Sequence, residues 1–181
     1  WSSPIIWEHF GAFLEWILRR FGIRELVRYV DDFLFAVAAA QGLAKALEVR
    51  DRIIAILARL GVRVSEKKLA AEGFPSFTSI FLGVLIDTRR MIARLPPPKC
   101  KRLRSVLAAV LRADTVALKQ LQSLAGLLAF AARVARPGRP FLARLYALLR
   151  DTKAAGEKSA VLPSDVRDDL AWGRRLLGRW P

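Results

Sequence analysis

The sequence predicts an α+β fold in which a segment of mixed helices and strands precedes a helical segment. Its 181 residues are 54% hydrophobic and 26% charged, which suffices to bury a core in one sizeable domain or two small lobes. Up to residue 95, apolar residues alternate between helical spacing and short β-branched runs. Pro96-Pro97-Pro98 then marks a boundary, because proline disfavours both helix and strand continuation. We therefore expect two parts, residues 1–95 and residues 96–181.

The first part should open with a helix that begins at Pro4, with Ser3 as its N-cap. Glu15 and Arg19 are four residues apart, the spacing of a helical ion pair, and Gly22 provides the stop. The apolar residues recur every three or four positions, as one face of a helix requires. They are Ile6, Phe10, Phe13, Ile17 and Phe21.

The next segment predicts a β-hairpin with two carboxylates at its turn. Residues 25–30 and 33–37 are rich in aromatic and β-branched residues, and Asp31 and Asp32 lie between them. Unit charges 4 Å apart repel by about 4 kcal/mol at an effective dielectric near 20, so two ionised neighbours favour a cation. Magnesium prefers such oxygen ligands and supports phosphoryl transfer. The alternative is a solvated turn, since aspartate is common in turns.

The remaining elements follow from spacing and from proline and glycine. A second helix is expected over residues 43–60, and strands over 62–64 and 80–86, the latter with residues 91–95 as a hairpin partner. After the prolines the chain is predicted to be all helical. The candidate helices there span residues 101–111, 118–134, 140–150 and 164–177.

Charge and cysteine content narrow the partners and the compartment. The 31 Lys and Arg residues outnumber the 16 Asp and Glu residues, so the formal charge of +15 favours a polyanion, above all nucleic acid. A single cysteine excludes an internal disulfide framework and favours a reducing, intracellular location, with nucleus and cytoplasm not distinguished. Charged residues interrupt every apolar stretch, so no membrane partner is expected.

The densest basic cluster flanks the three prolines, where it is placed to follow a phosphate backbone. A solvated helix start is the equally weighted alternative. Glu8 and Glu15, on the first helix, are interpreted as part of a solvated face. The cluster consists of Arg89, Arg90, Arg94, Lys99, Lys101, Arg102 and Arg104.

Four motifs follow one another in the first part: Ser2-Ser3-Pro4 at a helix start, Tyr29-Val30-Asp31-Asp32, the segment 60–68 with Lys67-Lys68, and Phe81-Leu82-Gly83-Val84-Leu85. In order and spacing this series resembles the palm of a reverse transcriptase. The motifs match that family's template-side helix, aspartate hairpin, lysine-bearing loop and primer-grip hairpin. The resemblance covers about residues 1–95. The helical part resembles the thumb and connection of retrotransposon polymerases, nearest those of tyrosine-recombinase retroelements.

The resemblance implies a partial palm, a small antiparallel sheet with two covering helices, that performs RNA-directed DNA synthesis with two magnesium ions. Asp31 would be their principal ligand and Asp32 a second one. Lys67 or Lys68 would place a cation near the pyrophosphate leaving group, where an ammonium stabilises developing charge.

The substrate contacts are implied in the same way, for a template-primer duplex and deoxynucleoside triphosphates. Tyr29 and Val30 would lie beneath the primer end. Ser2, Ser3 and Pro4 would lie near the templating base pair. The residues expected to hold the primer strand are Phe81, Leu82 and Gly83.

One departure from the family pattern limits the expected activity. The family supplies a further metal-binding aspartate from a strand before the first helix, and neither that strand nor the fingers are expected within this chain. We therefore predict that the parent protein polymerises DNA while these residues alone do not. Whether a ribonuclease H domain belongs to the same parent chain is left open by the sequence.

Two other functions remain open at this point. One is a non-catalytic nucleic-acid-binding module derived from a retroelement polymerase, which would keep the basic surface and lose the chemistry. The other is an RNA-directed RNA polymerase or a nucleotide cyclase, whose palms also carry acidic hairpins. The Leu82-Gly83 motif after the lysines disfavours the cyclase by resemblance.

Overall fold

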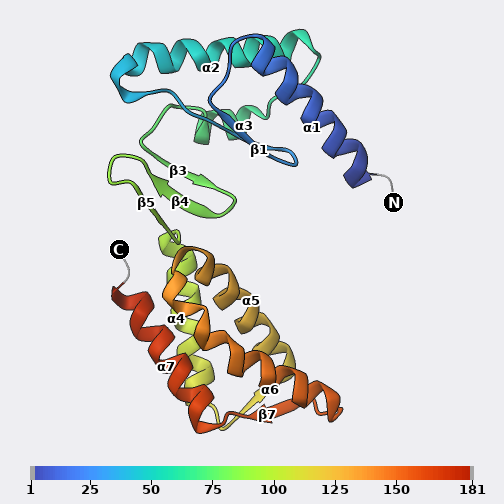
Figure 1. The fold of residues 1–181 in the computed structure, drawn as a ribbon, viewed down its shortest axis with the longest axis vertical. Coiled ribbons are helices and arrows are strands. Elements are labelled where there is room, and N and C mark those ends of the chain that lie inside the picture. The colour runs from blue at the N-terminus through green and yellow to red at the C-terminus, as the bar shows by residue number, and fades with distance from the viewer. Residues whose placement is uncertain (1–2, 180–181) are drawn as a thin grey trace. The chain divides into compact units, whose positions relative to one another are not determined.

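The computed structural model describes residues 3–179, without the side chains of residues 3, 71, 72, 136 and 179. Its fold is mixed α+β, largely helical with small antiparallel sheets, as the sequence predicts in outline (Figure 1). The chain forms two compact units, of which the first ends at Leu82 and the second begins at Gly83.

The first unit contains helices, a hairpin and a final short strand. In order these are α1 (Ser3–Arg20), β1 (Leu26–Tyr29), β2 (Asp32–Phe35), the 3-10 turn η1 (Ala39–Gln41), α2 (Gly42–Arg59), α3 (Glu66–Glu72) and β3 (Thr78–Phe81).

The core of this unit lies where α1, the β1–β2 hairpin and α2 meet. Leu18 of α1 is almost fully buried, and it clusters with Leu26 of β1 and Ile53 and Ile56 of α2. Phe33 packs against this cluster from β2. The buried stripe of α1 therefore holds the hairpin through apolar contacts on one hairpin face.

The predicted ends of α1 and α2 are confirmed, and both use the same glycine cap. Gly22 and Gly61 have positive φ angles of 86° and 72°. After each glycine, the next backbone N–H donates to a carbonyl five positions earlier: Ile23 to Leu18 and Val62 to Leu57. This is the Schellman arrangement. The strand predicted over residues 62–64 is therefore wrong, since this stretch closes α2 and then remains irregular.

The second unit begins with a short hairpin and continues into helices. In order it contains β4 (Val84–Asp87), β5 (Ile92–Arg94), α4 (Pro97–Arg112), β6 (Thr115–Ala117), α5 (Leu118–Val134), the 3-10 turns η2 (Arg136–Gly138) and η3 (Pro140–Leu142), α6 (Ala143–Ala154), β7 (Ser159–Val161) and α7 (Ser164–Arg179).

Its four long helices enclose one apolar core. Helix α4 contacts α5 and α7, and α6 contacts the same two helices (Figure 1). Leu107, Leu121 and Leu124 at the centre have no exposed surface. The Arg167 guanidinium of α7 donates to the carbonyls of Leu111 and Ala113, which caps the end of α4.

Two predictions for this unit are wrong in instructive ways. The helix expected over residues 101–111 already begins at Pro97. Pro97 and Pro98 occupy its first turn, because early helical positions need no N–H donor. The region is also not all helical, since β6 and β7 pair antiparallel with Val116 opposite Ala160. Three-residue strands are too short to show a period, and only their partner identifies them.

The strand predicted over residues 80–86 is interrupted in its middle. Leu82 and Gly83 have φ angles of 49° and 76°, so the chain turns there and β3 and β4 are separate strands. The predicted pairing with residues 91–95 is confirmed, because β4 pairs antiparallel with β5. The functional boundary drawn at residue 96 stays a prediction.

Candidate functional site

The two aspartates lie at the tip of the β1–β2 hairpin, as predicted. Leu26 pairs with Phe35 and Tyr29 with Asp32, which leaves Val30 and Asp31 as a two-residue loop. Both carboxylates are exposed to solvent. The tip therefore presents two oxygen-bearing groups, one from the loop and one from the first residue of β2.

The loop holds its first residue in a strained conformation. Val30 has a φ angle of 55°, a region that β-branched residues rarely occupy. Two-residue hairpin loops require such positive φ angles to match strand twist, and glycine or asparagine usually provides them. Strain of this kind, about 1–3 kcal/mol, persists only where surrounding structure imposes it.

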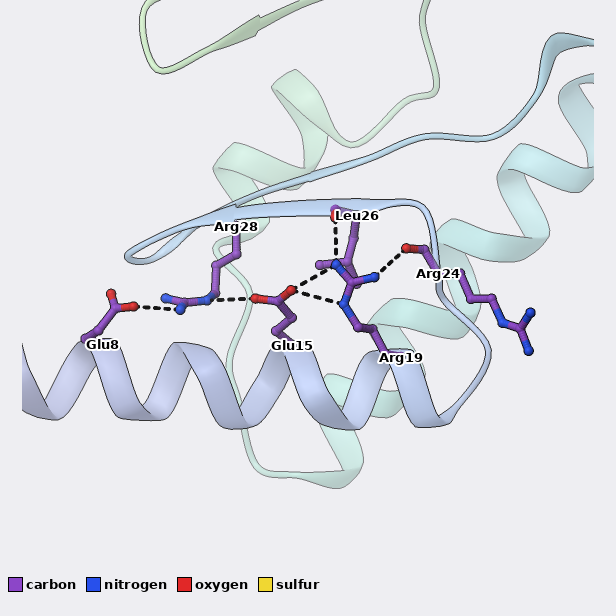
Figure 2. A network of polar contacts seen from close by, with 6 residues as sticks. All are labelled: Glu8, Glu15, Arg19, Arg24, Leu26 and Arg28. Carbon is purple, nitrogen blue, oxygen red and sulfur yellow. Dashed lines mark hydrogen bonds and ion pairs between the residues drawn. The ribbon is translucent and has the colours of Figure 1, made fainter.

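A network of ion pairs imposes the position of the hairpin on α1 (Figure 2). The Arg28 guanidinium, whose side chain is 11% exposed, contacts Glu8 Oε1 at 2.7 Å and Glu15 Oε2 at 3.2 Å. Glu15 also pairs with Arg19, as the spacing predicts. Arg19 in turn donates to the carbonyl of Leu26. Glu8 remains 54% exposed, as a solvated face predicts, whereas Glu15 is half-buried; both also dock the hairpin through Arg28, a role that the solvated-face interpretation missed.

Gly11 lets the hairpin tip approach the helix closely. A Cβ at this position would lie 2.6 Å from the Val30 carbonyl oxygen and 2.9 Å from Arg28 Nη1. Arg28 Nη1 itself donates to that carbonyl at 3.2 Å. Any side chain at position 11 would therefore push the loop with Asp31 away from α1. Nothing in the local sequence pattern indicates that Gly11 is needed for a close approach.

The network also leaves the aspartates free of cationic partners. Arg28 is engaged by Glu8, Glu15 and a backbone carbonyl, and neither Asp31 nor Asp32 forms an ion pair within residues 3–179. In the same range, no three His, Cys, Asp or Glu side chains gather as a metal site. The oxygen-only donors of the tip match the ligand preference of magnesium.

The lysines expected near the leaving group lie on α3, not in a loop. Ser65 caps this short helix by accepting a hydrogen bond from the Lys68 backbone N–H at 3.4 Å. Lys67 and Lys68 are both exposed in the first turn. In the described residues, no hydrogen bond or ion pair joins the Lys67 or Lys68 side chain to Asp31 or Asp32.

The residues expected at the template and primer are spread over several elements. Pro4 lies exposed in the first turn of α1, the Ser3 side chain is not described, and Ser2 lies outside the described residues. Tyr29 is exposed at the end of β1 beside the aspartates. Phe81 ends β3 half-buried, and Leu82 is exposed.

Lys99 from the basic cluster is engaged inside the second unit. Its ammonium donates to the Gly83 carbonyl at 3.2 Å and lies 4.5 Å from the centre of the Phe130 ring. A Cβ at Gly83 would collide with that ammonium. The lysine therefore ties the start of the unit to α4 and α5 through a hydrogen bond and a cation–π contact.

Folding places further basic side chains beside the predicted cluster. Lys101, Arg102 and Arg104 are exposed on the first turns of α4, while Arg94 is half-buried. Helix α7 packs against α4, with Arg104 Nη2 4.0 Å from the Cβ position of Gly178. This packing adds two exposed residues, Arg174 and Arg175, to the basic cluster. They lie outside the cluster predicted from the sequence, although two adjacent arginines after Gly173 indicate a local concentration of positive charge.

The other two members of the cluster follow β4. Arg89 and Arg90 are exposed in the turn, where their backbone N–H groups donate to Asp87 Oδ1 at 3.0 and 2.9 Å. Asp87 thus orders the turn that carries both guanidinium groups.

No family model, curated protein or solved structure matches this chain. Among residues 3–179, no helix combines the length and apolar character that crossing a membrane requires.

The first prediction concerns the close approach at Gly11. Gly11→Ala should lower the free energy of unfolding of the first unit by about 1–2 kcal/mol, because overpacking outweighs the helix-propensity gain. The matched control is Gly126→Ala on α5, where a Cβ meets nothing within 4 Å. It should stabilise by about 0.5–1 kcal/mol. Urea titration with hydrogen exchange measured for each unit provides the test, and an unaltered or more stable Gly11→Ala variant would contradict it.

The second prediction is that the docking of the hairpin on α1 weakens at acidic pH. The hydrogen bond from Arg28 lowers the pKa of Glu8, and that from Arg19 lowers the pKa of Glu15, below the ordinary value of 4.5. Their stabilisation is therefore complete above pH 4.5 and is lost as pH falls through the lowered values. Hydrogen exchange in β1 should accelerate over this acidic range.

Arg28→Gln should reduce that acid dependence, while the exposed control Arg63→Gln should retain it. An identical pH profile for Arg28→Gln and the unaltered chain would show that the network does not hold the hairpin.

Proposed function

We propose that this chain forms part of the palm and thumb of a reverse transcriptase and takes part in template-directed DNA synthesis. The observation that carries the proposal is the hairpin tip. Asp31 and Asp32 are exposed there without ion-pair partners in the described residues, and ion pairs to α1 hold the hairpin that carries them. Precise placement on regular elements is what a catalytic carboxylate requires, and a merely solvated turn does not need it.

In this proposal Asp31 and Asp32 supply oxygen ligands to magnesium, together with a further carboxylate from outside the described residues. Magnesium, when bound, neutralises phosphate charge and lowers the cost of attack by the primer 3′ hydroxyl. The tip contributes negative charge without a competing guanidinium, since Glu8 and Glu15 retain Arg28. Lys67 or Lys68 then provides the cation for the departing pyrophosphate.

The strained loop fits the same role. Val30 connects Tyr29 to Asp31, and its positive φ fixes the direction in which the next carboxylate leaves the backbone. Arg28 donates to the Val30 carbonyl, and Gly11 leaves the space in which that carbonyl lies. The strain supports a functional hypothesis because it lies at the residue next to the proposed metal ligand.

The third prediction tests the assignment of Asp31 in the complete protein that contains this chain. Asp31→Asn should lower primer extension on a template-primer by on the order of a hundredfold or more, because the amide keeps the shape and loses the metal-binding charge. Asp32→Asn should cause a smaller loss.

The matched control is Asp51→Asn on α2, an exposed aspartate paired with Arg50, which should extend primers normally. Equal extension by Asp31→Asn and the unaltered protein would remove the assignment.

The alternative function is a non-catalytic nucleic-acid-binding module, and a specific surface favours it. The α4/α7 basic face, defined as Lys101, Arg104, Arg174 and Arg175, is exposed, and helices α4 and α5 contain no acidic residue. The aspartates of α7 lie in its first half, where Asp165 and Asp169 pair with Arg144. Positive charge therefore dominates the end of α7 beside α4, as phosphate binding requires.

The fourth prediction tests this face on duplex DNA. Combined Arg104→Gln, Arg174→Gln and Arg175→Gln should weaken binding and reduce the slope of log affinity against log salt by up to about 2.7, or about 0.9 per lost phosphate contact. The control replaces Arg150, Lys153 and Lys158 with Gln, which removes the same charge elsewhere in this unit.

Equal loss in both triple variants would show that net charge, not this face, determines binding. If the Asp31→Asn protein binds DNA and extends primers normally, Asp31 has no catalytic role. If the unaltered protein and its variants all bind DNA and none extends primers, the alternative function is favoured.

A further inference from the structure

A cavity of about 200 Å³ lies in the first unit beneath the hairpin tip. Residues of α1, of the hairpin loop and β2, and of the end of α2 line it. They include Trp7 and Phe10 from α1, Phe33 from β2 and Leu57 from α2. Asp31 is the one charged residue among those that line it. An apolar cavity with a single fixed charge is the usual composition of a small-molecule site.

The aromatic rings form a wall of defined geometry. Trp7 and Phe10 meet edge to face, with ring centres 5.8 Å apart and an interplanar angle of 79°. On the hairpin side, Phe33 and Phe35 stack at 6.1 Å with planes 7° apart. Such a wall favours a flat apolar ring in its interior. Aromatic faces also attract cations through their quadrupole.

The charge of Asp31 determines the polar end of the occupant. No ion pair compensates this carboxylate in residues 3–179, and the nearest guanidinium on the hairpin is held by Glu8 and Glu15. A cationic group is therefore the complement that the cavity lacks. The volume lies below the 300–1,000 Å³ of drug-sized pockets, so the occupant has on the order of ten non-hydrogen atoms.

We propose that this cavity binds a small arylalkyl ammonium ion, with its ring among Trp7, Phe10 and Phe33 and its ammonium at Asp31. The site is distinct from nucleic-acid or nucleotide recognition and does not rest on the proposed function. It shares Asp31 with that function, so an occupied cavity would compete with metal binding at the tip.

The test uses the full chain at 0.15 M salt, without metal, nucleotide or nucleic acid. Phenethylammonium is titrated while the fluorescence of Trp7 is followed against a Trp7→Phe reference. We expect saturable binding in about the millimolar range. The neutral analogue 2-phenylethanol should bind about tenfold more weakly, because it lacks the charge-assisted hydrogen bond.

Asp31→Asn should abolish this preference by weakening the ammonium about tenfold and leaving the alcohol unchanged. The control Asp51→Asn should bind both as the unaltered chain does. Phe10→Ala should weaken both ligands together, since it removes ring contact and no charge.

Several outcomes would overturn the inference. These are an absence of saturable binding, equal affinity for the ammonium and the alcohol, or an unaltered preference in Asp31→Asn. Binding of methylammonium as tightly as phenethylammonium would also overturn it, because the carboxylate would then act without the cavity. None of these results bears on primer extension by the complete protein, so failure here is distinguishable from failure of the polymerase proposal.

Discussion

The position of the hairpin on α1 depends on one guanidinium. Arg28 spans two carboxylates that lie seven residues apart on the helix (Figure 2). It also donates to the Val30 carbonyl in the loop. The side chain is largely shielded from water, and an unpaired charge in such a shielded position would be costly. Its pairing with Glu8 and Glu15 therefore aligns the strand along the helix and keeps the tip aspartates available. The aspartate tip, the strained loop and the cavity beneath it all depend on this alignment.

Close packing at the tip adds a second constraint. Gly11 is the point at which the helix backbone and the loop meet, and the contact leaves no room for a methyl group. The ion pairs supply attraction and the glycine supplies space, so each is effective only with the other. This explains how Val30 can retain a φ angle that its branched side chain disfavours. These contacts give Asp31 a defined position relative to α1.

In the second unit, some basic side chains stabilise the fold and others face solvent. Lys99 and Arg167 donate hydrogen bonds to backbone carbonyls within the unit, whereas the α4/α7 basic face remains exposed. Basic residues close together in sequence therefore divide between structural and solvent-facing roles. A count of lysines and arginines predicts affinity for a polyanion in general. The packing of α7 against α4 decides which of them share one face.

Local sequence determined the long helices, their glycine caps and the hairpin with Asp31 and Asp32, because spacing, turn chemistry and capping act over a few residues. Tertiary contacts decided the rest. The β6–β7 pair joins segments more than forty residues apart, and the roles of Gly11 and Arg28 exist only once the hairpin lies on α1. Glu8 and Glu15 have the pattern of a solvated face, and a partner from a distant strand makes them docking residues. The physical reason is that periodicity reports which side of an element is apolar, whereas the identity of a charged partner depends on the folded chain.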